Sequence, residues 1–207
     1  MIEQIFPENV LVEYFKDHKL YEEKLTKKCF ELEKTVPKGG PGWLSKNTYN
    51  TMDNFDLTKD RDFDPITNFV KEQVKVYCQG VGISYKAISP EPFLPWFNIY
   101  RKKDFQEYHH HSNTALSCVY FLSGNSEKGA KLFLKKGLND MLSPQTTHPT
   151  PLNVDRLFYN PDPGKLVMFR GHVEHAVEAH EDDTPRISLT YNFYCVPIRG
   201  QGGLATL

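Results

Sequence analysis

The sequence predicts a mainly β fold of the α+β kind, in which a sandwich or barrel of short strands follows a helical N-terminal part. After Pro90, short apolar and aromatic runs are separated by Gly, Pro, Asn and Asp, which is typical of antiparallel sheets. Before Pro90, two stretches repeat apolar residues at helical intervals. The last run, 186–196, alternates apolar and polar residues as a strand does.

The N-terminal part contains two helical patterns. The first extends from Glu8 to about Glu33 and predicts one or two amphipathic helices. The segment VPKGGPGW ends this pattern, because its glycines and prolines cannot continue a helix, and we expect a loop followed by irregular polar chain. The second pattern, 63–78, predicts a helix that stops at Gly80 and Gly82.

The C-terminal part predicts seven strands. We expect them at 96–101, 106–111, 116–122, 131–135, 165–170, 175–178 and 186–196. Between the fourth and fifth lies a Pro- and Thr-rich insert, 143–155, which is long for a hairpin and predicts a lid or rim loop. We expect one domain over residues 1–207, with 1–90 as mostly helical support and 91–198 as the β core.

Composition excludes some classes of partner. The 25 basic and 26 acidic side chains give a formal charge of -1, which indicates neither nucleic acid nor an anionic membrane as a partner. No run of about 18 apolar residues predicts a membrane span, and the acidic start resembles no export signal. The four cysteines lack CxxC spacing. We therefore expect a soluble cytoplasmic protein with buried free thiols.

The last strand has two chemically different faces. Ile187, Leu189, Tyr191 and Phe193 share one face, and Arg186, Ser188, Thr190 and Asn192 share the other. The polar face either lies in water or lines a ligand cavity inside a barrel. In a cavity, Arg186 and Ser188 could hold a carboxylate.

Three consecutive histidines lie in the segment EYHHHSN. On a strand, His109 and His111 project from one face and His110 from the other. Two such side chains can bind one metal ion, and His175, at the start of a later alternating run, could supply a third ligand. The alternative is that these are surface or core histidines. The other two downstream histidines are expected to be exposed (His172 and His180).

The order and spacing of the motifs resemble the Fe(II)- and 2-oxoglutarate-dependent oxygenases, in particular a group of small bacterial and phage enzymes. The matching elements are Trp96 with Asn98, His109 with His111, LSCVYF, GKLVMF, His175 with Val177, and RISLTYNF. The segments IFPENV and GGPGWLSKNTYN are similar as well, so that the resemblance covers nearly the whole chain. If the gene is from a phage, the site of action would be the host cytoplasm.

The resemblance implies a double-stranded β-helix, or jelly roll, with the N-terminal helices packed on one sheet. It implies an Fe(II) site in which His109 and His175 are ligands and His111 is the third. Most of the wider superfamily carries Asp or Glu at that third position. The alternative ligands are therefore the nearest carboxylates, Glu107 first and Glu174 second. An imidazole at the third position makes the complex more positive by one charge.

For 2-oxoglutarate, the resemblance implies that Arg186 and Ser188 bind the far carboxylate. The pair Asn98 and Tyr100 matches a co-substrate pair in related oxygenases, and Asn192 could reach the co-substrate or the substrate. The expected reaction hydroxylates an unidentified small molecule or protein side chain and converts 2-oxoglutarate to succinate and CO2, with ascorbate as a candidate reductant. The loop 39–50 and the insert would roof the site, with rim aromatics at Trp43, Trp96 and Tyr159.

Other functions remain as alternatives. A three-histidine zinc hydrolase or lyase explains the ligands but not Arg186 with Ser188. A cupin-type metal enzyme would also fit a jelly roll, but cupins place a glutamate four or five residues after HxH, where this chain has Ala115 and Leu116. A non-catalytic jelly-roll module for binding or virion assembly is the third alternative.

Overall fold

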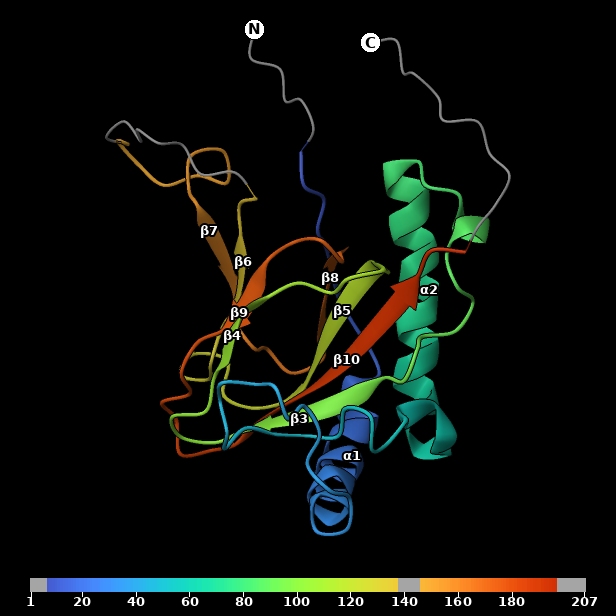
Figure 1. Cartoon of the computed structure of the whole chain (residues 1–207), viewed down its shortest axis with the longest axis vertical. Helices are drawn as coiled ribbons and strands as arrows, with labels where there is room; N and C mark the ends of the chain where they lie inside the picture. Colours follow the sequence, from blue (N-terminus) through green and yellow to red (C-terminus); the bar gives the residue numbers. More distant parts are fainter. Residues whose placement is uncertain (1–6, 138–145, 197–207) are drawn as a thin grey trace, which may run out of the picture.

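The computed structural model describes residues 7–137 and 146–196, which form two antiparallel sheets and two long helices (Figure 1). The helices are α1 (His18–Glu33) and α2 (Asp64–Val81), with short 3-10 turns η1 (Leu57–Lys59), η2 (Arg61–Phe63) and η3 (Tyr85–Ala87). The strands are β1 (Leu11–Tyr14), β2 (Tyr49–Asn50), β3 (Trp96–Tyr100), β4 (Gln106–His109), β5 (Thr114–Ser123), β6 (Leu132–Lys135), β7 (Arg156–Tyr159), β8 (Lys165–Arg170), β9 (His175–Val177) and β10 (Arg186–Tyr194). The expected mainly β jelly-roll architecture is confirmed.

The larger sheet has the strand order β1-β8-β5-β10-β3-β2, and the smaller one has the order β4-β9-β6-β7. One face of the larger sheet packs on the helices and forms the main core, with Leu25 of α1 and Val70 of α2 fully buried against it. The other face packs on the smaller sheet and forms a second core that includes Phe121, Leu132 and Phe169. The molecule is therefore layered, with the helices on one side of the larger sheet and the smaller sheet on the other (Figure 1).

Helix α2 agrees with its sequence pattern. Pro65 lies in the first turn, where its missing N–H breaks no helical hydrogen bond. The helix ends at Gly82, whose φ of 72° is a left-handed conformation that glycine adopts at low cost. Its buried face carries Ile66, Val70 and Val74 on the larger sheet.

The first helical pattern was longer than the helix that forms. Residues Leu11–Tyr14 form β1, which pairs with β8 in antiparallel register, and α1 begins only at His18. The pairing explains the difference, because β8 needs a partner at its outer edge and Leu11–Tyr14 supplies the hydrogen bonds. The short strands β2 and β7 were also not predicted, and β7 follows directly after the insert 143–155, of which 143–145 lie outside the described residues.

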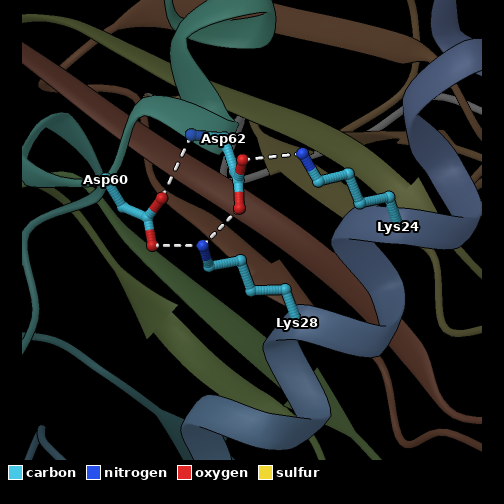
Figure 2. Close-up of polar contacts among 4 residues, drawn as sticks. All are labelled: Lys24, Lys28, Asp60 and Asp62. Carbon is cyan, nitrogen blue, oxygen red and sulfur yellow. Dashed lines mark hydrogen bonds and ion pairs between the residues drawn. The ribbon is translucent and has the colours of Figure 1, made fainter.

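Ion pairs attach α1 to the segment that leads into α2 (Figure 2). The ammonium group of Lys28 contacts both Asp60, at 2.6 Å, and Asp62, and Lys24 lies 2.7 Å from Asp62. Asp60 also accepts a hydrogen bond from the backbone of Asp62, at 3.0 Å. These contacts lower the pKa of Asp62 to about 2, chiefly through the hydrogen bonds from the two lysines.

Two composition-based expectations can be compared with the structure. Neither α1 nor α2, nor any other helix within residues 7–137 and 146–196, is long and apolar enough to cross a bilayer. All four cysteines are free thiols, of which Cys29, Cys78 and Cys118 are buried as expected. Cys195 is exposed, so that part of the prediction was wrong, because β10 ends just before it.

Candidate metal centre

Both faces of β10 are buried, so the interpretation that its polar face lies in water is wrong. Ile187 and Leu189 pack in the core beneath the helices, whereas Arg186, Ser188 and Thr190 line a cavity between the two sheets. The cavity lies between two open sheets rather than inside a closed barrel. The polar face of the strand thus points at the smaller sheet, which carries two of the histidines.

Strands β4 and β9 bring His109 and His175 together. These two residues are direct partners in the antiparallel register, as are Gln106 and Val177. Three residue steps on β4 therefore face two on β9, which is a β-bulge. The bulge turns both Gln106 and His109 toward the cavity, although simple alternation would put them on opposite faces.

The third histidine, His111, follows the end of β4. Its backbone N–H donates to Gly171 O at 2.9 Å, which holds the segment against the turn before β9. Glycine is required at 171, because a Cβ there would meet Thr114 O at 2.2 Å. His110 is exposed, as the strand alternation predicted.

The three imidazoles form a compact cluster. One nitrogen from each of His109, His111 and His175 lies within 4.8 Å of the others, and Nε2 of His111 lies 3.2 Å from Nε2 of His175. Two nitrogens that bind one metal ion at right angles, each at about 2.1 Å, are about 3 Å apart. The cluster therefore fits a single metal ion of the imidazole-binding kind, with three ligands from residues 7–137 and 146–196.

Two of the histidines are fixed in the form that binds metal through Nε2. Nδ1 of His109 donates to Glu107 O at 2.8 Å, and Nδ1 of His175 donates to Val173 O at 2.9 Å, since a carbonyl can only accept. Such a bond fixes the tautomer and leaves Nε2 as a lone pair. Burial lowers the pKa of all three imidazoles, that of His111 to about 4, so they are neutral at pH 7.

Arg186 is fully buried and lines the same cavity as the three histidines. Its guanidinium lies 4.7 Å from the ring centre of Tyr100 and 4.9 Å from that of Phe121. Among the described residues, none of its three nitrogens has a partner at full hydrogen-bond geometry, although the nearby Tyr100 hydroxyl acts to raise the pKa of Arg186. Burial lowers its pKa, but a guanidinium stays charged, and an unpaired buried cation costs several kcal/mol unless an anion joins it.

The cavity has a free volume of about 30 Å³, which is room for a few water molecules. It is lined by Trp43, Trp96, Asn98, Tyr100, Gln106, His109, His111, Val119, Leu132, His175, Val177, Arg186, Ser188 and Thr190. On its wall, Trp96 donates to the amide oxygen of Asn98 at 3.1 Å, and Asn98 donates to Thr190 at 3.1 Å. Asn98 therefore already has partners for its amide.

The loop that precedes β2 contributes Trp43 to the lining of the cavity. Gly40 allows its approach, because a Cβ at that position, where φ is 60°, would lie 3.0 Å from the indole. The loop is anchored at Leu44, whose N–H donates to the carboxylate of Glu107 at 2.9 Å. A ligand of about ten heavy atoms exceeds this volume and can enter only if a wall moves, and Trp43 is the lining residue farthest along the chain from a helix or strand.

The remaining predicted residues occupy other positions. The carboxylates proposed as alternative ligands lie outside the metal cluster, since Glu107 binds Leu44 and Glu174 pairs with Lys135 at 2.8 Å. Asn192 does not line the cavity but lies behind His111, with its amide nitrogen 2.7 Å from Nδ1. Residues 146–155 of the insert and the third rim aromatic, Tyr159, do not line it either.

Two features of the site were not anticipated. Gln106 reaches the cavity through the bulge, and alternation along the sequence gives no signal for it. Buried His180 was predicted to be exposed, and that prediction was wrong. Its ring accepts from the backbone of Ala130 at 3.1 Å and donates to Thr184 O at 2.9 Å, so it ties two loops together.

The segment that carries the site is similar to a known protein family. The model of the family described as "Putative 2OG-Fe(II) oxygenase" matches residues 95–192, which include the three histidines and Arg186. The match spans 98 of the 207 residues, and over this segment the chain is similar to that family. The resemblance expected from the motifs is confirmed over this segment, and the three histidines His109, His111 and His175 fit its HxH and downstream H pattern. No curated protein sequence matches the chain.

Solved structures of similar fold include two prolyl hydroxylases and an epimerase. A prolyl-4-hydroxylase from Pseudomonas putida is 16% identical with a TM-score of 0.65, over 92% of this chain and 94% of that one. The epimerase SnoN, in complex with Fe3+ and alpha ketoglutarate, is 13% identical with a TM-score of 0.64, over 96% and 89%. A viral collagen prolyl hydroxylase from Paramecium Bursaria Chlorella virus-1 is 13% identical with a TM-score of 0.58, over 89% and 96%. At these identities the likeness establishes the fold alone.

Proposed function

We propose that the chain is a hydroxylase that holds Fe(II) with His109, His111 and His175 and binds 2-oxoglutarate through Arg186. The observation that carries this proposal is the pairing of a three-nitrogen cluster with a buried guanidinium that has no partner among the described residues, in one cavity. 2-Oxoglutarate has a chelating keto acid at one end and a carboxylate at the other. Its binding therefore needs a metal ion for the first end and a cation such as Arg186 for the second.

Each side chain has a defined task. The Nε2 atoms of the three histidines hold the ion as neutral ligands and leave its other positions to exogenous molecules. Arg186 pairs with the far carboxylate in a dry site, where a charge-assisted bond is strong. Ser188 lies two residues along the same strand face and can donate to the same carboxylate. Tyr100, whose pKa burial raises to about 12, stays protonated and can donate as well.

The walls control access. Val119, Leu132 and Val177 give the cavity an apolar side, which excludes water from the reacting groups. Trp43 covers the cavity from a loop, so entry of the co-substrate and approach of the substrate require its displacement. When bound, Fe(II) and 2-oxoglutarate would supply an oxidative decarboxylation with dioxygen as the oxidant, in which one oxygen atom enters succinate, CO2 leaves, and the other oxygen atom converts a substrate C–H bond to C–OH.

The substrate is proposed only at the level of chemical class. It is a C–H bond of a small molecule or a protein side chain that reaches the cavity past Trp43. The charge balance of the chain does not favour nucleic acid.

Anaerobic addition of Fe(II) and then 2-oxoglutarate to the protein tests the proposal. We expect a weak visible charge-transfer band from the chelate, and slow succinate formation once air is admitted. Zn(II) in place of Fe(II) should give neither signal. Absence of the band together with absence of succinate would contradict the proposal, and zinc-dependent hydrolysis of an ester would favour the zinc-hydrolase alternative.

A further inference from the structure

Among the three candidate ligands, His111 differs in the group that its Nδ1 contacts. His109 and His175 each donate from Nδ1 to a backbone carbonyl, at 2.8 and 2.9 Å, and a carbonyl allows only one tautomer. Nδ1 of His111 instead lies 2.7 Å from the side-chain amide of Asn192. A carboxamide contains both a donor and an acceptor, so the backbone does not fix the tautomer of His111.

Asn192 is held so that either end of its amide can face His111. It is buried near the end of the polar face of β10, directly opposite Ser117 on β5. Its Oδ1 is buried and has no hydrogen-bond partner among residues 7–137 and 146–196. A half-turn of the amide about its last bond exchanges oxygen and nitrogen in the same space. The oxygen can therefore reach Nδ1 of His111 without any shift of the backbone.

The two amide orientations have opposite consequences for metal binding. If the amide nitrogen donates to Nδ1 of His111, the ring carries its hydrogen on Nε2, pointing at His175 Nε2 3.2 Å away. That tautomer has no lone pair toward the cluster. If the amide oxygen accepts from Nδ1–H, Nε2 is free to bind. Only the second orientation makes His111 a ligand.

We propose that Asn192 is a positioning residue for the metal site: its amide oxygen accepts from Nδ1–H of His111 and thereby presents Nε2 of His111 to the metal. This rests on the metal site proposed above. An imidazole at the third ligand position has an outer nitrogen that must be satisfied in a buried site, and Asn192 supplies the acceptor that the backbone supplies to His109 and His175.

Metal affinity of matched variants tests the proposal. Co(II), which also binds imidazole, is titrated into the whole chain and into Asn192→Leu and Asn192→Asp. Leucine removes the acceptor at similar size, and we expect affinity to fall about 10- to 100-fold. Aspartate can only accept, and we expect affinity at least equal to wild type. Ser117→Ala, beside Asn192 but without a hydrogen bond to lose among the described residues, should bind as wild type does.

A second readout does not depend on the stability of any variant. In zinc-loaded wild-type protein with 15N-labelled histidine, long-range proton–nitrogen NMR spectra report which ring nitrogen of His111 carries hydrogen. We expect hydrogen on Nδ1. If Asn192→Leu fails to fold, this spectrum and the Asn192→Asp titration decide.

Three results would overturn the role of Asn192: wild-type affinity in Asn192→Leu, an equal loss in Asn192→Asp and Asn192→Leu, or hydrogen on Nε2 of His111 in the zinc-loaded protein. Each of them requires that the wild type binds metal. A wild type that binds no Co(II) would instead remove the metal site, and with it this proposal.

Discussion

The two faces of strand β10 are both buried, but they are buried for different purposes. On one face, Ile187, Leu189 and Phe193 pack beneath the helices, and the hydroxyl of Tyr191 meets that of Thr67 at 3.3 Å. On the other face, the guanidinium of Arg186 and the amide oxygen of Asn192 are buried without hydrogen-bond partners among the described residues. The polar group of the first face has a hydrogen-bond partner, whereas Arg186 and the amide oxygen of Asn192 on the second face have none among the described residues.

This difference separates stability from function along a single strand. Burial of a large apolar side chain favours folding by about 1.5–3 kcal/mol, whereas an unpaired buried polar or charged group opposes it. A ligand gains the most binding free energy from a buried polar or charged group that has no partner in the protein. Substitutions on the apolar face should therefore change stability alone, and substitutions on the cavity side should change binding.

The largest effect is expected on the cavity side at the metal cluster. His175→Ala removes one of three ligands and should abolish Fe(II) binding, as measured by anaerobic titration. His110→Ala is the control, since its exposed side chain lies outside the cluster. An equal loss of Fe(II) binding in both variants would mean that the histidine run does not divide into inward and outward side chains.

On the apolar face, Leu189→Ala should lower the free energy of unfolding by about 3 kcal/mol, because it leaves a cavity in the main core. Urea unfolding measures this loss. Fe(II) affinity of the folded variant should be unchanged. A weakened metal site in this variant would show that the two faces are coupled.

Arg186→Leu should weaken 2-oxoglutarate binding by about 2 kcal/mol, or about 30-fold, because the far carboxylate loses its partner. Calorimetric titration of the metal-loaded protein measures it. The same change should raise the melting temperature of ligand-free protein by about 2–4 °C, since it removes an unpaired buried charge. A lower melting temperature with unchanged 2-oxoglutarate affinity would make Arg186 a structural residue of the core.

The smallest effect is expected far from both faces, at the ion pairs of Figure 2. The pKa of Asp62 is about 2, below its usual 3.8, so its ion pairs stabilise the folded state fully above pH 4. This contribution is lost as pH falls from 4 toward 2. Asp62→Asn should therefore melt slightly below wild type at pH 7 and at the same temperature as wild type near pH 2. A difference that persists at pH 2 would not be electrostatic.

Local patterns predicted much of the chain because they depend on neighbours in sequence. The alternation of 186–196 gave the two faces of β10, and the apolar spacing before Gly82 gave α2. The HxH spacing separated His110 from its neighbours even though β4 ends at His109. In contrast, β1 was predicted as helix, because its conformation depends on the free edge of β8, which is far away in sequence.

By itself, the sequence determined that a polar strand face, a pair of histidines and a distant third histidine exist, since side-chain direction follows from local backbone geometry. Only the tertiary structure decided that the polar face is buried, that a bulge turns Gln106 inward beside His109, and that Asn192 lies behind His111. These facts depend on which strands pair and in which register. Turns fix the register of strands that are neighbours in sequence, but β4 and β9 are far apart in sequence, so no turn between them signals their pairing or its bulge.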